Sequence, residues 1–242
     1  MDYNLQPIWN ALLEVWRESY AICERHKLRI WVAYGTAIGA MRHKGFIPWD
    51  DDFDVVMPRK DYNLFMKYAV EELPPYMKWH SIENDPVHRH LFGKVQDERT
   101  GLLDEIRRQS HLNLEQGIFV DFFPLDGLPS SKIGCLLWKF RRAVIRRFKL
   151  FGGSNVRLQN WLMKKDFDKS QNVGWALSNL RWPRFINKKK WFDDTMFVDF
   201  EGERVPLPIG IEQFLRTEYG DYMKLPPEEE RKPSHQIIPS RA

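Results

Sequence analysis

Four aspartates crowd into five residues in the first quarter of the chain. They are Asp50, Asp51, Asp52 and Asp54, and the apolar residues 55–57 follow them. Carboxylates this close together repel one another and raise one another's pKa. A cation among them relieves the repulsion, and a divalent metal, which prefers oxygen ligands, is the simplest candidate.

The spacing of Asp52 and Asp54 indicates which acids act together. If residues 52–56 form a strand, both carboxylates lie on one face of it, about 7 Å apart, while Phe53 and Val55 point into the core. Two carboxylates on one rigid element can hold Mg2+ against phosphate oxygens. The alternative is a solvated acidic turn before a strand, and the residues upstream of the acids disfavour it.

Those upstream residues predict a phosphate-binding turn. Gly35 and Thr36 follow an apolar stretch and open a short segment with helical character. A strand, a glycine turn and a hydroxyl that caps a helix leave N–H groups that favour an anion. Arg42 and Lys44 would flank the far end of this helix. Together with the acids, the segment predicts a phosphate held between a helix N-terminus and a metal.

Three separated motifs resemble the LicD family, which has fukutin and fukutin-related protein as distant animal relatives. The motifs are Tyr34-Gly35-Thr36 with Gly39-Ala40, Arg42, Gly45, residues 47–52 and Asp54; residues 117–127; and residues 219–223 followed by Pro226-Pro227. They span most of the chain. The resemblance implies an α+β fold, with a nucleotidyltransferase-like mixed β-sheet flanked by helices and a mainly helical C-terminal extension.

The resemblance also implies a reaction. It would be transfer of a phosphorylated alcohol from a CDP-linked donor to a glycan hydroxyl, with release of CMP and dependence on Mg2+ or Mn2+. Phosphocholine is the usual substituent in bacterial members and ribitol phosphate in the animal relatives, while glycerol phosphate is a further alternative. The acceptor would be a cell-surface glycan such as lipopolysaccharide, teichoic acid or capsule.

The roles of individual residues follow from the same resemblance. In the family fold a Gly-Thr turn cradles phosphate, an Asp-x-Asp pair binds metal, and a third carboxylate comes from a neighbouring strand. Those parts fall on Gly35 and Thr36, on Asp52 and Asp54, and on Asp121.

Asp121 is also singled out by its own context. It interrupts the apolar run 118–123, and a buried carboxylate needs a partner or a raised pKa. It is a candidate to ligate the metal or to accept the proton of the attacking hydroxyl. Glu115 and Asp104 are further candidates for the base. Asp126 is predicted to be a turn residue.

Lys94 lies between apolar residues in the predicted strand 91–96. Two interpretations are open. Its ammonium contacts a donor phosphate, together with Arg42 and Lys44, or it belongs to an edge strand and extends into water.

The composition changes after residue 130. Residues 1–129 are predicted to form the catalytic core, and 130–242 a helical, basic extension that packs back on it. Residues 132–149 hold seven cations and no acid, with most apolar side chains in one helical arc and Trp138 on the cationic side. This pattern is typical of a helix on an anionic membrane surface. A solvated basic face is the alternative, and nucleic acid is not expected because no base-stacking platform accompanies the cations.

Composition places the chain in the cytosol, at most peripheral to the inner membrane face. The net charge of +4 over 242 residues is mild and fits an anionic partner. Two distant cysteines favour a reducing compartment, and neither a signal peptide nor a transmembrane run is expected. Two rival functions remain: a nucleotidyltransferase that moves the nucleotide itself, and an inactive scaffold for glycan assembly at the membrane surface.

Overall fold

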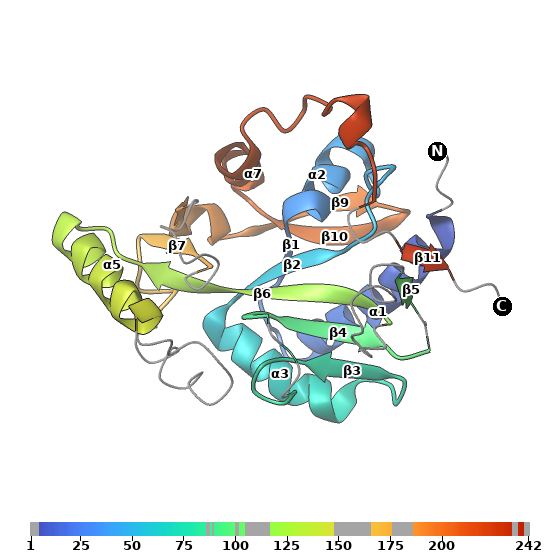
Figure 1. Ribbon diagram of the computed structural model, residues 1–242, viewed down its shortest axis with the longest axis horizontal. Coiled ribbons are helices and arrows are strands. Elements are labelled where there is room, and N and C mark those ends of the chain that lie inside the picture. The colour runs from blue at the N-terminus through green and yellow to red at the C-terminus, as the bar shows by residue number, and fades with distance from the viewer. Residues whose placement is uncertain are drawn as a thin grey trace.

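The computed structural model describes residues 5–85, 88, 90–99, 102–104, 117–147, 166–175, 186–233 and 237–239. Within them, helices flank a mixed β-sheet, in agreement with the predicted α+β class (Figure 1). The sheet order is β1 (Trp31–Val32), β2 (Asp54–Pro58), β6 (Ile118–Leu128), β4 (Gly93–Asp97) and β3 (Met77–His80). β2 and β6 are parallel, and the other neighbours are antiparallel. β7 (Asn172–Gly174) pairs with the far end of β6, and β8 (Asn187–Lys188) pairs with β7.

The helices fall into two groups. α1 (Gln6–Arg25) and α3 (Arg59–Glu72) pack against each other and against β6. α2 (Tyr34–His43) contacts α7 (Ile211–Tyr219), β2 and β9 (Thr195–Phe200), and Figure 1 shows α2 and α7 together above β1. α5 (Lys132–Arg147) follows β6, and short elements complete the described fold: η2 (Lys189–Phe192), β10 (Glu203–Pro208), η3 (Glu228–Glu230), and β5 (Leu102–Asp104) paired with β11 (Ile237–Pro239).

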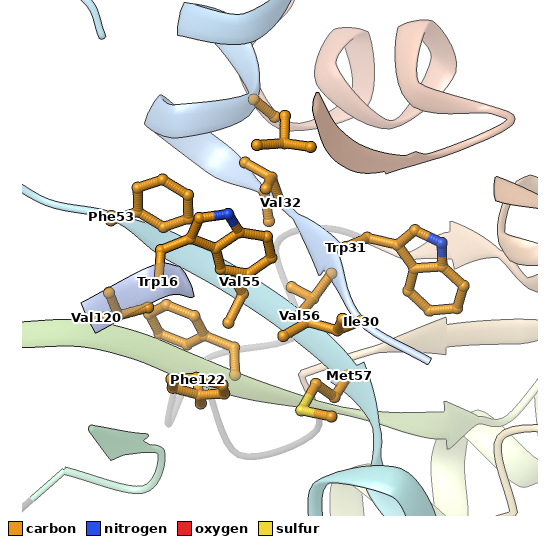
Figure 2. Close-up of a cluster of buried hydrophobic side chains, with 14 of the residues drawn as sticks. Trp16, Ile30, Trp31, Val32, Phe53, Val55, Val56, Met57, Val120 and Phe122 are labelled. Carbon is orange, nitrogen blue, oxygen red and sulfur yellow. The ribbon is translucent and has the colours of Figure 1, made fainter. Parts of the chain in front are cut away.

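The core forms around β2 and β6. Phe53, Val55, Val56 and Phe122 are fully buried, as expected for central strands covered on both sides. Figure 2 shows Trp16 of α1 beside Phe53, and their ring centroids are 5.1 Å apart. Burial of each such side chain contributes about 1.5–3 kcal/mol, so this core holds the start of β2 in place.

One predicted strand is shorter than expected, and another begins later in the chain. The strand predicted before Gly35 is reduced to Trp31–Val32, which pair with Val56 and Val55. The strand predicted over 52–56 begins only at Asp54. Asp52 therefore precedes the strand, between a turn and the sheet, and the argument that placed it by strand alternation was wrong.

Asp126 was also predicted wrongly, as a turn residue. It lies inside β6, where both carboxylate oxygens accept hydrogen bonds of 2.9 Å from Arg59 at the start of α3. The side chain of Asp126 is only 4% exposed and that of Arg59 only 11%. This buried, bidentate ion pair fastens α3 to the central strand.

The chain after residue 130 returns to the core. Trp31 Nε1 donates to Thr195 Oγ1 at 2.9 Å, and β1 contacts β10. β9 and β10 form an antiparallel hairpin, whose turn places Glu201 and Gly202 at φ 50° and 79°. The described residues of this part include strands β7 to β11 as well as α5 and α7. None of the described helices is both long and apolar enough to cross a bilayer.

The Arg59–Asp126 pair gives a stability test. Asp126→Asn leaves a buried guanidinium without a compensating charge, so we expect the free energy of unfolding to fall by about 3–5 kcal/mol. Arg59→Met combined with Asp126→Leu removes both charges and should recover most of that loss. Urea unfolding measures both variants. Asp199→Asn, a change at an exposed position, is the control. If Asp126→Asn lowered the free energy of unfolding no more than this control, the ion pair would not stabilise the fold.

Candidate active site

Three adjacent strands bring charged side chains together. Asp54 opens β2, Asp121 lies directly opposite it in β6, and Lys94 lies opposite Asp121 in β4. Neighbouring strands are about 4.8 Å apart, and residues in register project from the same face. The two predicted metal-binding strands therefore do meet, and they meet beside a cation.

Lys94 and Asp121 form an ion pair, with 2.9 Å between Nζ and Oδ1. Both residues are 7% exposed, and Nζ also lies 3.3 Å from the centroid of the Phe119 ring. β4 is an interior strand, so the interpretation of Lys94 as an edge residue was wrong. Contact with a donor phosphate remains a prediction.

The acidic residues are held in an unfavourable electrostatic arrangement. Burial raises the pKa of Asp54 well above its usual range, and Asp52, Asp121 and Asp50 raise it further, while Lys94 offsets part of the effect. Carboxylates that share a site behave in this way because none can ionise without repelling the others. The site therefore holds more negative charge than Lys94 neutralises.

Asp50 joins this cluster, although the predicted set did not include it. Burial, and then the neighbouring Asp52 and Asp51, raise the pKa of Asp50 to about 9. Its Oδ2 atom is buried and has no hydrogen-bond partner among the described residues. That oxygen approaches Gly35 so closely that a Cβ there would lie 2.8 Å away, so glycine is required for the carboxylate to reach the helix start.

Thr36 does not cap α2, contrary to the prediction. The helix begins at Tyr34 after the N-cap Ala33, and Ala37 donates a helical hydrogen bond to Ala33. Instead, Thr36 Oγ1 accepts a 2.9 Å hydrogen bond from the backbone N–H of Asp54. The hydroxyl positions the acidic strand. The N–H groups of Gly35 and Thr36 still lie at the open end of the helix, where an anion is favoured.

Tyr34 enters α2 with a φ of 48°, a costly conformation for a residue with a side chain. Its ring packs against Phe123 and Phe214, at centroid distances of 5.2 and 5.8 Å. The packing from β6 and α7 holds this conformation, which marks the helix start as a strained point next to the acids.

Arg42 and Lys44 occupy the other end of α2. Arg42 Nη1 donates to the carbonyl of Tyr222 at 2.6 Å, and burial and Arg231 lower the pKa of Arg42. Lys44 is exposed in a left-handed conformation (φ 57°), and its carbonyl accepts from the N–H of Glu201. These contacts hold the C-terminal segment and the β9–β10 turn. The predicted phosphate contacts of both cations stay predictions.

Two residues at the end of α7, the helix that contacts α2, were not among the predicted site residues: Glu218 and Tyr219. Burial raises the pKa of Glu218 to about 7. A 3.3 Å hydrogen bond from Asn187 Nδ2 acts in the opposite direction and lowers it. Glu218 and Asp54 both raise the pKa of the half-buried Tyr34, and Asp54 raises that of Tyr219. Tyr219 opened the third motif in the sequence, but no local signal marked Glu218.

The residues fit a divalent cation by charge and by donor type. Asp50, Asp52, Asp54 and Asp121 supply carboxylate oxygens, which Mg2+ prefers. In the described part of the chain, no three His, Cys, Asp or Glu side chains already form a metal-binding group. The base candidates Glu115 and the side chain of Asp104 lie outside the described residues.

Comparisons with known proteins agree with this architecture. Residues 27–126 match the family described as LicD/FKTN/FKRP, nucleotidyltransferase domain. The chain is also 32% identical, over 245 residues, to the lipopolysaccharide cholinephosphotransferase LicD of Haemophilus influenzae, and the match covers 89% of this chain and 90% of that protein. Two uncharacterized proteins, from Rickettsia prowazekii and Rickettsia typhi, match at 31% identity over 51 residues, or 21% of this chain and 19% and 16% of theirs.

The comparisons thus identify the chain as a transferase, with residues 27–126 matching a nucleotidyltransferase domain. More particularly, the chain belongs to the LicD family, as the three sequence motifs implied.

The raised pKa of Asp54 gives a test of the charge cluster that does not depend on activity. A carboxyl group whose pKa is higher in the folded state stabilises the fold below its unfolded pKa, about 3.9, and loses that contribution as pH rises. Asp54→Asn should therefore raise Tm in metal-free buffer at about pH 8, by about 2–4 °C per kcal/mol of repulsion removed. The difference should disappear near pH 4.

Mg2+ should raise the Tm of the native chain at about pH 8, because an ion bound only by the folded state stabilises it. Asp54→Asn should reduce that increase, whereas the exposed control Asp199→Asn should keep it. Equal Mg2+ responses in all three proteins would disprove a cation site at Asp54.

Proposed function

We propose that the protein transfers a phosphorylated alcohol, with phosphocholine as the leading candidate, from a CDP-linked donor to a hydroxyl group of a cell-surface glycan. CMP would be released, and the reaction would require Mg2+ or Mn2+. The principal support is the match along 89% of the chain to a lipopolysaccharide cholinephosphotransferase. The site adds chemical support, because a cation and a helix N-terminus each stabilise a doubly charged pyrophosphate.

The roles of the residues follow from their positions. Asp52, Asp54 and Asp121 would hold the divalent ion, which when bound supplies positive charge to the pyrophosphate oxygens. The N–H groups of Gly35 and Thr36 would orient the phosphate from the opposite side. Thr36 also fixes Asp54 through its backbone.

Lys94 would act mainly by orienting Asp121. Its ammonium is buried and already paired with that carboxylate at 2.9 Å, so it can fix the position of the Asp121 side chain. Lys94 also lowers the pKa of Asp54, whereas Asp121 raises it.

Glu218 is the residue we assign as general base. An efficient base has a pKa near the working pH, and burial raises the pKa of Glu218 to about 7. α7 contacts α2, and both Glu218 and Asp54 raise the pKa of Tyr34 at the start of α2, so both carboxyl groups lie near that residue. In the proposed step, the acceptor hydroxyl gives its proton to Glu218, its oxygen bonds to the phosphorus that carries the alcohol, and the bond to CMP breaks.

Asp54→Asn tests the proposed reaction directly. With CDP-choline and a glycan acceptor, we expect CMP release to fall by at least about a hundredfold because the charge that holds the ion is lost. Circular dichroism should show an unchanged fold, and the exposed control Asp199→Asn should remain active. Near-native CMP release by the Asp54 variant would rule out its assignment as a metal ligand.

The same assay distinguishes the proposed reaction from its main rival, transfer of the nucleotide itself. The match to a nucleotidyltransferase domain favours that rival. Transfer of phosphocholine releases CMP and labels the glycan with choline. Transfer of the nucleotide instead leaves CMP on the acceptor and releases phosphocholine. CDP-choline labelled separately in choline and cytidine identifies which part is transferred, and cytidine label on the glycan would refute the proposed reaction.

Glu218→Gln tests the base. In the native protein, turnover should fall as pH drops through about 7, because Glu218 is then protonated. The Gln variant should lose about 100-fold or more in kcat and should no longer show that acidic limb. Stopped assays between about pH 5.5 and 9 measure both profiles. An acidic limb that persists in the variant would assign the base elsewhere.

A further inference from the structure

Helix α5 exposes its apolar side chains. The exposed fractions are 74% for Ile133, 68% for Leu136, 53% for Leu137 and 67% for Phe140. These positions are three or four residues apart, so they form one continuous strip along the helix. We call this strip the α5 apolar face.

Trp138 attaches the helix to the rest of the protein. It is only 5% exposed, although its place in the sequence predicted the cationic side of the helix. At the start of α5, Gly134 and Cys135 donate hydrogen bonds to Ser131, at 3.0 and 2.9 Å, soon after β6. These bonds cap the start of the helix, the buried Trp138 packs it onto the protein, and Figure 1 shows it at one end of the molecule beyond β7.

Cations border the α5 apolar face. Lys132, Lys139 and Arg141 are exposed, and none of the sixteen residues of α5 is acidic. At about 100° per residue, Lys132 and Lys139 fall along one border of the strip and Arg141 along the other. An apolar strip between two cationic borders is the arrangement of a helix that lies in the plane of a membrane interface.

The charges also decide between the occupants of this face. A second copy of the chain would bring two acid-free, basic helices together, and like charges facing each other across an interface are unfavourable. Anionic lipid headgroups complement the cationic borders, while the acyl region accepts Leu136 and Phe140.

We propose that the protein docks on an anionic phospholipid surface through the α5 apolar face. Ile133, Leu136, Leu137 and Phe140 insert at the boundary between headgroups and acyl chains, and Lys132, Lys139 and Arg141 contact headgroup phosphates. This docking is separate from the transfer chemistry and does not depend on which alcohol is moved.

Co-sedimentation of the full chain with vesicles tests the proposal. Vesicles that contain phosphatidylglycerol should bind the protein, pure phosphatidylcholine vesicles should bind it weakly, and added salt should reduce the difference. Leu136→Gln with Phe140→Gln should lower the partition coefficient by at least about tenfold. Lys139→Gln and Arg141→Gln should each lower it about fivefold at low salt.

Matched controls exist elsewhere on the surface. Val70→Gln with Ile209→Gln removes two apolar side chains that are 67% and 52% exposed, and Lys67→Gln removes an exposed cation of α3; both should bind vesicles like the native chain. Melting curves should show that every variant is folded.

Three results would overturn the proposal. The first is no vesicle binding by the native protein. The second is equal loss in the α5 variants and the controls. The third is a native dimer, seen by analytical ultracentrifugation, that Leu136→Gln with Phe140→Gln converts to monomer while vesicles bind neither form; a second copy would then cover the face.

Discussion

The arrangement of the site depends on one constraint, the enforced closeness of several carboxylates at the junction of β2, β6 and α2. The backbone leaves Asp54 no other position. Its N–H donates to Thr36 Oγ1, its carbonyl accepts from the N–H of Ala33, and the preceding carbonyl, that of Phe53, accepts from Asp121. These bonds lie next to a core of fully buried aromatic and branched side chains. The free energy gained by burying these apolar side chains compensates the repulsion between the carboxylates. The fold can therefore keep the aspartates close together.

The local part of this arrangement could be predicted from the sequence. Gly35, Thr36 and the acids at 52 and 54 lie less than twenty residues apart, and a helix followed by a returning strand has few ways to place them. The resemblance to a known family added Asp121. The chemistry of Thr36 was nevertheless misassigned, because a hydroxyl beside a helix start is an equally good partner for a neighbouring strand. Capping rules describe the helix alone, and here the tertiary partner decided.

Sheet order explains the other differences. β6 lies between β2 and β4, although it follows both in the chain. Lys94 therefore becomes an interior residue opposite Asp121, and Asp126 continues a strand that the motif Asp126-Gly127 suggested was ending. Neither outcome depends on the residues nearby in sequence. The same is true of Glu218, which lies near Tyr34 because α7 packs on α2. Contacts between distant segments carry no local periodicity, so a single sequence cannot show them.

Helix α5 shows the limit of pattern reasoning most clearly. Its amphipathic arc was visible in the sequence, and such an arc ordinarily faces the protein core. In the structure the arc faces outward, and the single Trp138 on the opposite side makes the attachment. A hydrophobic pattern specifies that one face avoids water, but not what that face contacts. Only the packing of the neighbouring elements determines this, and in α5 it leaves the larger apolar surface uncovered while the cations stand at its borders.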